Sequence, residues 1–299
     1  MSGVGKITDT RYLAPETQLP VSLMDILSRI IAAKRGRLEE AKRVCPESEL
    51  RSEAFAFRKN STEHALAKAL SNERINIIAE FKRKSPSKGV IRDGSNPEVI
   101  TRSYESGGAA GISVLTEEDH FEGSLKDLRA AKAAVRLPVL RKDFIVEDYQ
   151  VYESAAAGAD ALLLIVAALD DEKLSRLRRL AEDQLRMDAL VEVHTKEEIQ
   201  RAAAAGARLI GVNNRNLKTF EVSLDTSVQL ATEAPANAIL VSESGLNSGA
   251  DLRRLYGLGY RGFLIGESLM RADRPDEALR ELIGEQGTGR RGDGETGRQ

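Results

Sequence analysis

Charged and polar residues follow short apolar runs at six places in the chain, where buried strands would end. In the first of these, the segment IIAEFKRKSPSKG, Glu80 and Lys82 come directly after the apolar residues. The corresponding positions after the later runs hold Lys142 and Asp143; Glu192; Asn213, Asn214 and Arg215; Ser242, Glu243 and Ser244; and Gly266 and Glu267. A carboxylate among apolar neighbours is costly unless a cation or hydrogen-bond donor meets it. The set therefore predicts one polar cavity that is a candidate functional site.

Strand alternation indicates which of these side chains meet, because residues two positions apart in a strand point to the same side. Glu80 and Lys82 therefore share one direction, and Asn213 and Arg215 share a direction in another strand. Glu192 points away from the two valines that flank it. The carboxylates and cations that we expect to meet in the cavity are Glu80, Glu192, Glu243, Lys82, Lys142 and Arg215.

Two segments with small residues, SESG and IGES, each stand after an apolar run and before a helical pattern. Backbone N–H groups at such a place, together with the dipole of the following helix, form a site for an anion. The pair therefore predicts a phosphorylated small substrate, although glycine and serine also make ordinary turns.

The order of the elements predicts the fold that positions these groups. From residue 75 onward, apolar strands rich in β-branched residues alternate with helices rich in Ala, Leu and charged residues. Eight such units in roughly 210 residues are typical of a (β/α)8 TIM barrel, whose active site lies at the carboxyl ends of the strands. A doubly wound open sheet is the alternative, but no G-x-G-x-x-G motif follows the first strand.

Extra helices are expected before the barrel. Apolar residues recur at helical spacing over residues 21–44, with Ser22 as a possible cap, and a second helix is predicted over 62–70. The predicted organisation is a flexible arm (1–20), one barrel domain (21–284) with leading helices in 21–70, and a disordered tail (285–299) rich in Gly and charge.

Composition excludes several classes of function. The net charge of −2 provides no general basic field for nucleic acid or an anionic membrane. No apolar run reaches the ~18 residues of a membrane helix, and the first residues lack the apolar core of a secretory signal. A single cysteine and three scattered histidines predict neither a disulfide nor a metal site. We expect a cytoplasmic, metal-free protein.

Several motifs together resemble those of the indole-3-glycerol phosphate synthase family, the ring-closing enzymes of tryptophan biosynthesis. The resemblance covers about residues 24–283, including the leading helices, and its motifs are IIAEFKRKSPSKG, LPVLRKDFIVEDYQVYESAAAGADALLLI, LVEVHT, IGVNNRNL, VSESGL and FLIGESLM. It implies a carboxy-lyase that converts 1-(2-carboxyphenylamino)-1-deoxyribulose 5-phosphate into indole-3-glycerol phosphate, carbon dioxide and water, without a cofactor or metal.

The resemblance also implies catalytic roles. Lys142 would be the general acid that protonates the substrate carbonyl. Glu192 would accept a proton or stabilise the cationic intermediate. Lys82 would hold anionic groups of the substrate and supply a proton for dehydration, and Glu80 would orient a lysine. Asn213 would hold the ribulose hydroxyls and the developing polar centre.

Further residues are expected to bind the substrate. By the same resemblance, Arg215 would hold the ribulose hydroxyls and the developing polar centre together with Asn213, and Glu243 would complete the polar ring. Ser85 and Pro86 would belong to a loop that closes over the substrate. The expected phosphate-binding residues, acting mainly through backbone N–H groups, are Ser244, Gly245, Gly266 and Glu267.

Four other residues have less specific interpretations. We expect Lys84 and Lys88 to be solvated loop charges, and His194 to be a helix-start or surface histidine. Asp143 is interpreted as a partner of Lys142 or as a turn former.

Three alternatives to this function remain. One is another phosphate-binding barrel enzyme such as phosphoribosylanthranilate isomerase, although that family is shorter and uses a cysteine where Glu80 and Lys82 stand here. Another is a Schiff-base enzyme with Lys142 as nucleophile, and the third is a non-catalytic barrel that binds a phosphorylated metabolite. For the expected enzyme we predict a phosphorylated small-molecule substrate, neither nucleic acid nor membrane as a partner, and a monomer, with a weak homodimer as the alternative.

Overall fold

The predicted TIM barrel is present in the computed structural model, which describes residues 26–86, 88–217 and 219–284. Eight parallel strands close in the order β1-β10-β9-β8-β7-β6-β5-β4. Their bounds are β1 (Asn76–Phe81), β4 (Gly111–Leu115), β5 (Val139–Lys142), β6 (Ala161–Ile165), β7 (Asp188–Val193), β8 (Leu209–Asn213), β9 (Ile239–Glu243) and β10 (Tyr260–Ile265). The predicted arm and tail, and the proposed cap at Ser22, lie outside the described residues.

The strands read as continuous apolar runs because the barrel buries both of their faces. Every residue of β1, β4, β6, β7 and β8 is buried. Alternate side chains fill the barrel interior, and this inner cluster includes Ile78, Leu140, Leu163, Leu190, Leu209, Val241 and Leu264. The remaining strand side chains pack outward against the helices.

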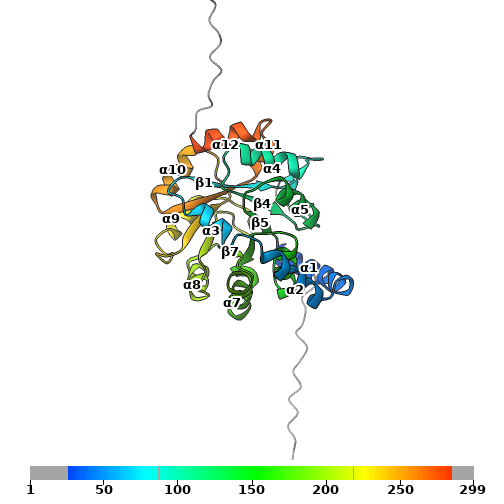
Figure 1. Cartoon of the computed structure of the whole chain (residues 1–299). Helices are drawn as coiled ribbons and strands as arrows, with labels where there is room; N and C mark the ends of the chain where they lie inside the picture. The colour runs from blue at the N-terminus through cyan, green and yellow to red at the C-terminus, as the bar shows by residue number, and fades with distance from the viewer. Residues whose placement is uncertain (1–25, 87, 218, 285–299) are drawn as a thin grey trace, which may run out of the picture.

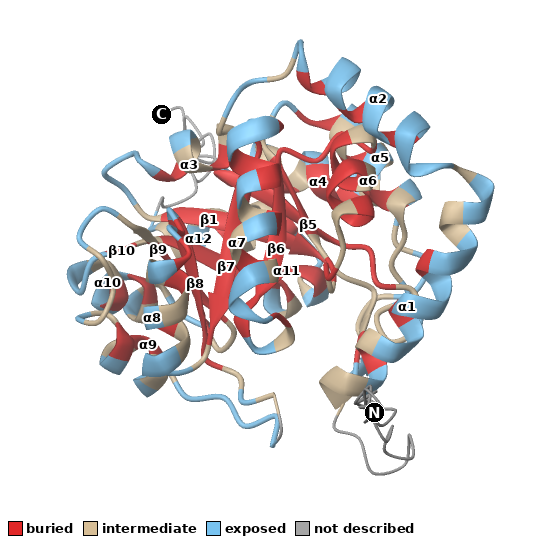
Figure 2. Cartoon of the chain, turned by 90° about the horizontal axis from the view of Figure 1, so that it is seen from below, coloured by how far each residue is buried: buried red, intermediate tan, exposed pale blue. Residues whose placement is uncertain are grey.

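A ring of helices surrounds the strands (Figure 1). Its members are α4 (Pro97–Ser106), α5 (Leu125–Ala134), α6 (Asp148–Ala156), α7 (Asp171–Arg179), α8 (Lys196–Ala204), α9 (Asp225–Leu230), α10 (Gly249–Gly257), α11 (Glu267–Arg271) and α12 (Pro275–Ile283). Their inner faces are buried and their outer faces exposed (Figure 2). Side-chain caps define several starts, as where Ser248 and Asp251 form a capping box on α10.

Between residue 26 and the first barrel strand, the described chain forms three helices, where the sequence predicted two. α1 (Ile26–Val44) follows the predicted periodicity, and α3 (Ala65–Leu70) lies within the second predicted helix but begins later. The unpredicted helix, α2 (Glu47–Arg58), lies beside α6, where the rings of Phe55 and Tyr152 are 6.4 Å apart.

α3 closes the barrel at the amino ends of the strands, on the side that faces the viewer in Figure 1. Leu66 and Leu70 enter the inner apolar cluster. Asp188, the first residue of β7, accepts hydrogen bonds from the backbone N–H groups of Leu66 and Ala67. A Cβ on Gly111 would lie 2.9 Å from a methyl group of Leu66, so the glycine leaves room for this side chain at the closed end.

The remaining differences from the predicted elements are local. A short antiparallel hairpin, β2 (Lys84–Ser85) with β3 (Gly89–Val90), follows β1 in the predicted loop. The segment DDEKLSRLRRLAEDQ (170–184), for which the sequence predicts one helix after the fourth strand, forms α7 followed by a π-helical turn, Leu180–Gln184. A 3-10 turn, Val166–Ala168, follows β6.

Candidate active site

A cavity of about 880 Å³ opens at the carboxyl ends of the strands, where the sequence places the site. All thirteen predicted site residues line it: Glu80, Lys82, Ser85, Pro86, Lys142, Glu192, Asn213, Arg215, Glu243, Ser244, Gly245, Gly266 and Glu267. They come from six different strands and the loops that follow them. Barrel closure therefore gathers groups that are up to 187 residues apart, counting from Glu80 to Glu267.

The Lys142 ammonium stands between two buried carboxylates. Its Nζ lies 3.1 Å from Oε2 of Glu243 and 3.4 Å from Oε2 of Glu192. The side chain of Lys142 is 14% exposed, toward the cavity, and the two glutamates are almost fully buried. Asn213 donates a hydrogen bond of 3.1 Å to the other oxygen of Glu192. This geometry holds an ammonium donor and a carboxylate acceptor side by side.

Two glycines make room for two of the carboxylates. A Cβ on Gly211 would overlap Oε1 of Glu243, and a Cβ on Gly266 would lie 2.6 Å from Oε1 of Glu80. No described residue gives either oxygen of Glu243 a hydrogen bond of good geometry, so its contact with the Lys142 ammonium is an ion pair. The free space around these acids is thus set by the sequence of the neighbouring strands.

Burial and charge shift the protonation of this group in different directions. Burial disfavours the cation of Lys142, but Glu243, Glu192 and Glu80 outweigh it and raise its pKa above the ordinary value. Burial would raise the pKa of Glu192, yet Lys142, His194 and the Asn213 hydrogen bond bring it below its usual value. Burial raises the pKa of Glu243 to about 7, against the pull of Lys142 and with repulsion from Glu192 and Glu80. The resting cavity thus holds a protonated lysine beside an ionised Glu192.

A second lysine–glutamate pair lies at the end of β1. Nζ of Lys82 is 2.6 Å from Oε1 of Glu80, and the lysine side chain is 17% exposed. The predicted shared direction of these two side chains is therefore observed. On β8, the side chain of Asn213 accepts a hydrogen bond from the backbone of Arg215, whose guanidinium donates to the carbonyl oxygen of Phe220.

The two predicted phosphate segments lie at one side of the cavity. Ser244 and Gly245 have consecutive positive φ angles of 67° and 77°, and a Cβ on Gly245 would lie 2.5 Å from Val222. Gly266 precedes the first turn of α11, whose N–H groups have no partner within the helix. The side chain of Glu267 turns to Arg271, at 3.2 Å, so its carboxylate charge is balanced locally.

An apolar wall, which sequence reasoning missed, completes the cavity. It includes Phe121 and Phe144, whose ring centroids are 6.4 Å apart, and three residues of α1: Ile26, Leu27 and Ile30. The helical periodicity of α1 marked these residues as a buried face, but gave no sign that the face borders the site. The wall offers an apolar surface to an aromatic group.

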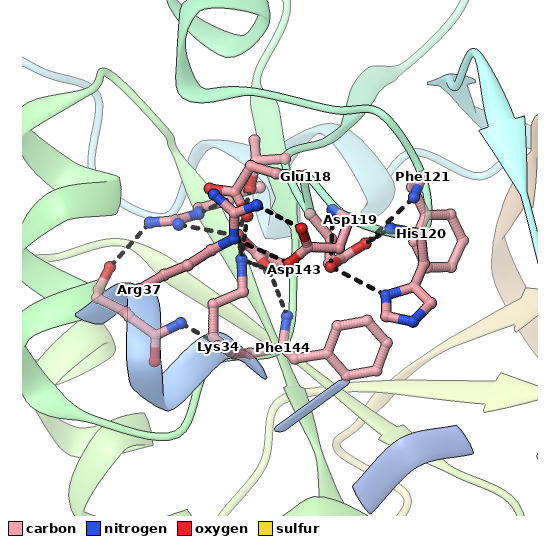
Figure 3. Close-up of polar contacts among 12 residues, drawn as sticks. Lys34, Arg37, Glu118, Asp119, His120, Phe121, Asp143 and Phe144 are labelled. Atoms are coloured by element: carbon pink, nitrogen blue, oxygen red, sulfur yellow. Dashed lines mark hydrogen bonds and ion pairs between the residues drawn. The ribbon is translucent and has the colours of Figure 1, made fainter. Parts of the chain in front are cut away.

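Ion pairs fix α1 to the loops that follow β4 and β5 (Figure 3). Lys34, which is 4% exposed, pairs with Asp143 at 2.9 Å and with Glu118 at 2.7 Å. Arg37 pairs with Asp119. The loop that carries these acids is itself held by Glu117, whose buried carboxylate accepts backbone N–H groups of residues 119, 120 and 121. These contacts therefore hold α1 and the loop that carries Phe121 in a fixed position relative to each other.

Asp143 is not the partner of Lys142 that the sequence suggested. Its carboxylate binds Arg141 at 2.9 Å, Lys34 and the hydroxyl of Thr116, and it also accepts the N–H of Phe144. The side chains of adjacent strand residues point to opposite sides, which directs Asp143 away from Lys142. Burial opposes ionisation of Asp143, but Arg141 and Lys34 lower its pKa to about 2.

Three other residues had provisional interpretations. His194 stands at the start of α8 as predicted, but its side chain is 12% exposed and reaches Glu192 rather than the surface. Lys84 pairs with Glu122 on the loop at 2.8 Å. Lys88 is exposed and borders the cavity.

Among the described residues there is neither a metal-binding cluster nor a membrane-spanning helix. No cluster of three or more His, Cys, Asp or Glu side chains there is placed to hold a metal ion. No helix in the described part of the chain is long and apolar enough to cross a membrane.

Comparison with known proteins extends the similarity beyond the cavity. The family model described as "Indole-3-glycerol phosphate synthase" matches residues 27–282. A protein of that name from Carboxydothermus hydrogenoformans is 45% identical over 262 residues, which are 86% of this chain and 99% of the relative. Another from Koribacter versatilis is 53% identical over 208 residues, which are 70% of this chain and 80% of the relative.

Solved structures share the fold at low sequence identity. The 3-hexulose-6-phosphate synthase of Salmonella typhimurium superposes with a TM-score of 0.56 at 12% identity, covering 71% of this chain and 98% of that one. That likeness shows the barrel alone. The family match and the two relatives decide the assignment, and by them the chain belongs to the indole-3-glycerol phosphate synthase family.

Proposed function

We propose that the cavity closes the indole ring of 1-(2-carboxyphenylamino)-1-deoxyribulose 5-phosphate, with loss of carbon dioxide and water, to give indole-3-glycerol phosphate. The observation that carries this mechanism is the buried Lys142 ammonium between Glu192 and Glu243, open to the cavity. Membership of the family supplies the reaction, and the placement of the predicted residues around one cavity supports their roles.

In the first step Lys142 acts as the general acid. The aryl carbon that bears the carboxylate attacks the ribulose carbonyl carbon, and the carbonyl oxygen takes a proton from the ammonium. Because the pKa of Lys142 is raised, the proton is present at neutral pH, and the alkoxide that develops is a stronger base than an amine. The apolar wall with Phe121 and Phe144 suits the aromatic ring.

Glu192 stabilises the cationic intermediate that ring attack leaves behind, or accepts a proton from it. Its pKa is lowered, so it is an anion before the reaction begins, and Asn213 fixes its orientation. Loss of carbon dioxide returns the bonding electrons to the ring system and cancels the positive charge. Because Glu192 is already ionised and already oriented by Asn213 before the reaction, little reorganisation of the site is needed during this step.

Lys82 and Glu80, at the end of β1, carry out the dehydration step. Lys82 protonates the departing hydroxyl, which leaves as water, and Glu80, 2.6 Å away, orients the ammonium. The ring carbon beside the nitrogen gives up a proton to the ionised Glu192, and the electrons of that C–H bond form the double bond of the indole. Before that step Lys82 also attracts anionic groups of the substrate.

The remaining residues hold the substrate in place. We assign the ribulose hydroxyls to Asn213 and Arg215, the completion of the polar ring to Glu243, and the closing loop after β1 to Ser85 and Pro86. The phosphate-binding group, through backbone N–H donors, is Ser244, Gly245, Gly266 and Glu267.

Fluorescence of the indole product tests this proposal, because the chain contains no tryptophan. We expect the purified protein to form product with a chelator present, and Lys142→Met to lose at least about 100-fold in kcat. Lys196→Met is the matched control, since Lys196 pairs with Glu233 on the exposed surface. A folded Lys142→Met variant with nearly normal turnover would remove Lys142 from the mechanism.

The same assay separates the alternatives, none of which any observation favours. Substrate binding without product would indicate a metabolite-binding barrel. Borohydride trapping of substrate on Lys142 would indicate a Schiff-base enzyme, and product formation from phosphoribosylanthranilate would indicate the isomerase.

We also propose that residues 21–284 form one folding domain, and that the protein works as a cytoplasmic monomer. The family match over residues 27–282 supports a single unit. Light scattering coupled to gel filtration should give the mass of one 32.6 kDa chain. A mass near twice that value, persisting on dilution, would indicate the homodimer instead.

A further inference from the structure

His194 reaches Glu192, the catalytic carboxylate of the proposed mechanism, although that mechanism gives the histidine no role. It lies two residues after Glu192, so strand alternation points both side chains to the same side. Its Nε2 is 3.4 Å from Oε1 of Glu192, and its Nδ1 is 3.3 Å from Oε2 of Glu198. The imidazole therefore stands between two carboxylates.

The number of protons on the ring decides how it fits this place. A neutral imidazole has one N–H, so one ring nitrogen would direct a lone pair at a carboxylate. An imidazolium has two N–H groups and meets both acids. Nε2 is buried and has no hydrogen bond of good geometry with any described residue, so Glu192 is the group that its charge must face.

Glu198 holds the histidine in this orientation. It lies in the first turn of α8, and its Oε2 also accepts the backbone N–H of His194 at 2.6 Å. The charged groups that act on the ring are Glu198 on α8, Glu192 on β7 and Glu243 on β9. Lys142 of β5 stands on the other side of Glu192.

Lys142 alone cannot keep Glu192 ionised throughout the reaction. In the proposed first step the ammonium transfers its proton and becomes a neutral amine. Glu192 then loses its nearest formal cation at the stage when it must face a cationic intermediate. Asn213 provides a hydrogen bond but no charge. A second cation beside Glu192 would keep its pKa low through this step.

We propose that His194 is a positioning residue for ring closure: as an imidazolium between Glu198 and Glu192, it keeps Glu192 ionised and oriented after Lys142 has given up its proton. This inference rests on the proposed function. Burial disfavours the charged ring, but the hydrogen bond to Glu198 and the charge of Glu192 outweigh it and raise the pKa of His194, in agreement with the geometry.

The pH profile of turnover tests this role. Activity that needs ionised Glu192 falls as the pH drops through its pKa. In His194→Gln that pKa rises, so the acidic limb of kcat should move up by about one pH unit, with about tenfold lower kcat on that limb. KM should change little. An unchanged limb and kcat in the folded variant would overturn the proposal.

His64→Gln is the matched control. His64 also stands beside a buried carboxylate, Asp188 at 3.3 Å, but at the amino ends of the strands, away from the cavity. Its pH profile of turnover should match that of the unmodified protein, and an equal shift there would also overturn the proposal.

Glu198→Gln provides a second variant in case His194→Gln does not fold. It keeps the ring but removes one of its two acids, so the limb should move in the same direction by a smaller amount. In the double variant the two shifts should not add, because both act through the same cation. An unmoved limb in Glu198→Gln, or additive shifts, would count against the proposal. Failure of the proposed function is distinguishable, because the unmodified protein would then form no product or Glu192→Gln would retain full turnover.

Discussion

At the scale of single residues, the site balances buried acids against buried cations. Glu192 and Glu243 both form ion pairs with the Lys142 ammonium, while Glu80 forms an ion pair with Lys82. Their pKa values move apart: burial, with repulsion from Glu192 and Glu80, raises that of Glu243, whereas Lys142, His194 and the Asn213 hydrogen bond outweigh burial and lower that of Glu192. The more basic Glu243 is the acid that carries a proton in the resting site at slightly acid pH.

Replacing Glu243 by Gln should change how stability depends on pH. Burial raises its pKa from 4.5 to about 7 in the folded protein, so its contribution is fully present below pH 4.5 and is lost as pH rises through 7. Relative to Glu243→Gln, the unmodified protein should lose at most about 3 kcal/mol of unfolding free energy over that interval. Urea unfolding at a series of pH values measures the difference. A difference that stays constant with pH would refute the raised pKa.

The sequence could indicate these residues because each lies at the end of a strand, and a barrel brings all strand ends to one face. It could not indicate the partner of Asp143. Lys34 stands 109 residues earlier in a helix, and only the packing of that helix brings the two together. For a similar reason the sequence did not predict that Phe121 lines the cavity. The conformation of the loop that carries it depends on hydrogen bonds to the buried carboxylate of Glu117.

At the scale of elements, α1 is a wall of the site as well as a leading helix. One side contributes apolar residues to the cavity, and Lys34 and Arg37 tie the helix to acids of the barrel. A buried ion pair of this kind fixes the orientation of the helix that carries it. Any other orientation would leave a buried charge without its partner, which costs more free energy than the pair itself contributes. The cavity therefore depends on a helix that lies outside the barrel in the chain.

Lys34→Met should loosen α1 and weaken substrate binding. Asp143 keeps Arg141 and Thr116, so we expect a loss of about 1–3 kcal/mol rather than unfolding. Amide hydrogen exchange in α1 should become faster, and KM should rise more than kcat falls. Lys42→Met, on the same helix, removes partly exposed pairs with Glu39 and Glu147 and should cost under about 1 kcal/mol. Equal effects of the two variants would show that the buried pair does not brace the helix.

Element prediction worked where burial followed chain periodicity and failed where it did not. All eight strands were predictable because both of their faces are apolar. α2 was not, since its buried face consists of Leu50, Ala54 and Arg58, while Phe55 and Phe57 are partly exposed. Arg58 is tolerated there because its guanidinium donates to Asp160 and to backbone carbonyl groups, including that of Leu185. A stripe that buries an arginine and exposes two phenylalanines carries no apolar pattern.

At the scale of the whole molecule, the two ends of the barrel have different tasks. The carboxyl end holds an open cavity lined by charged groups, and the amino end is closed by α3. Between them lies the inner apolar cluster, which includes Leu140, Leu163 and Leu190. A packed interior of this kind separates the closed end from the site, so a change that removes packing at the closed end should act on stability more than on chemistry.

Leu66→Ala tests that separation. Leu66 is fully buried in the closed end, and its truncation leaves a cavity that the backbone of β4 at Gly111 cannot fill. The expected loss is about 2–5 kcal/mol of unfolding free energy, which lowers Tm by roughly 5–15 °C for a domain of this size. Leu258→Ala is the matched control, because Leu258 is 41% exposed at the end of α10 and should change stability by about 0.5 kcal/mol or less. Well below Tm, kcat and KM of Leu66→Ala should equal those of the unmodified protein. If kcat instead fell while the variant remained folded, packing at the amino end would have to set the geometry of Lys142 through the barrel interior.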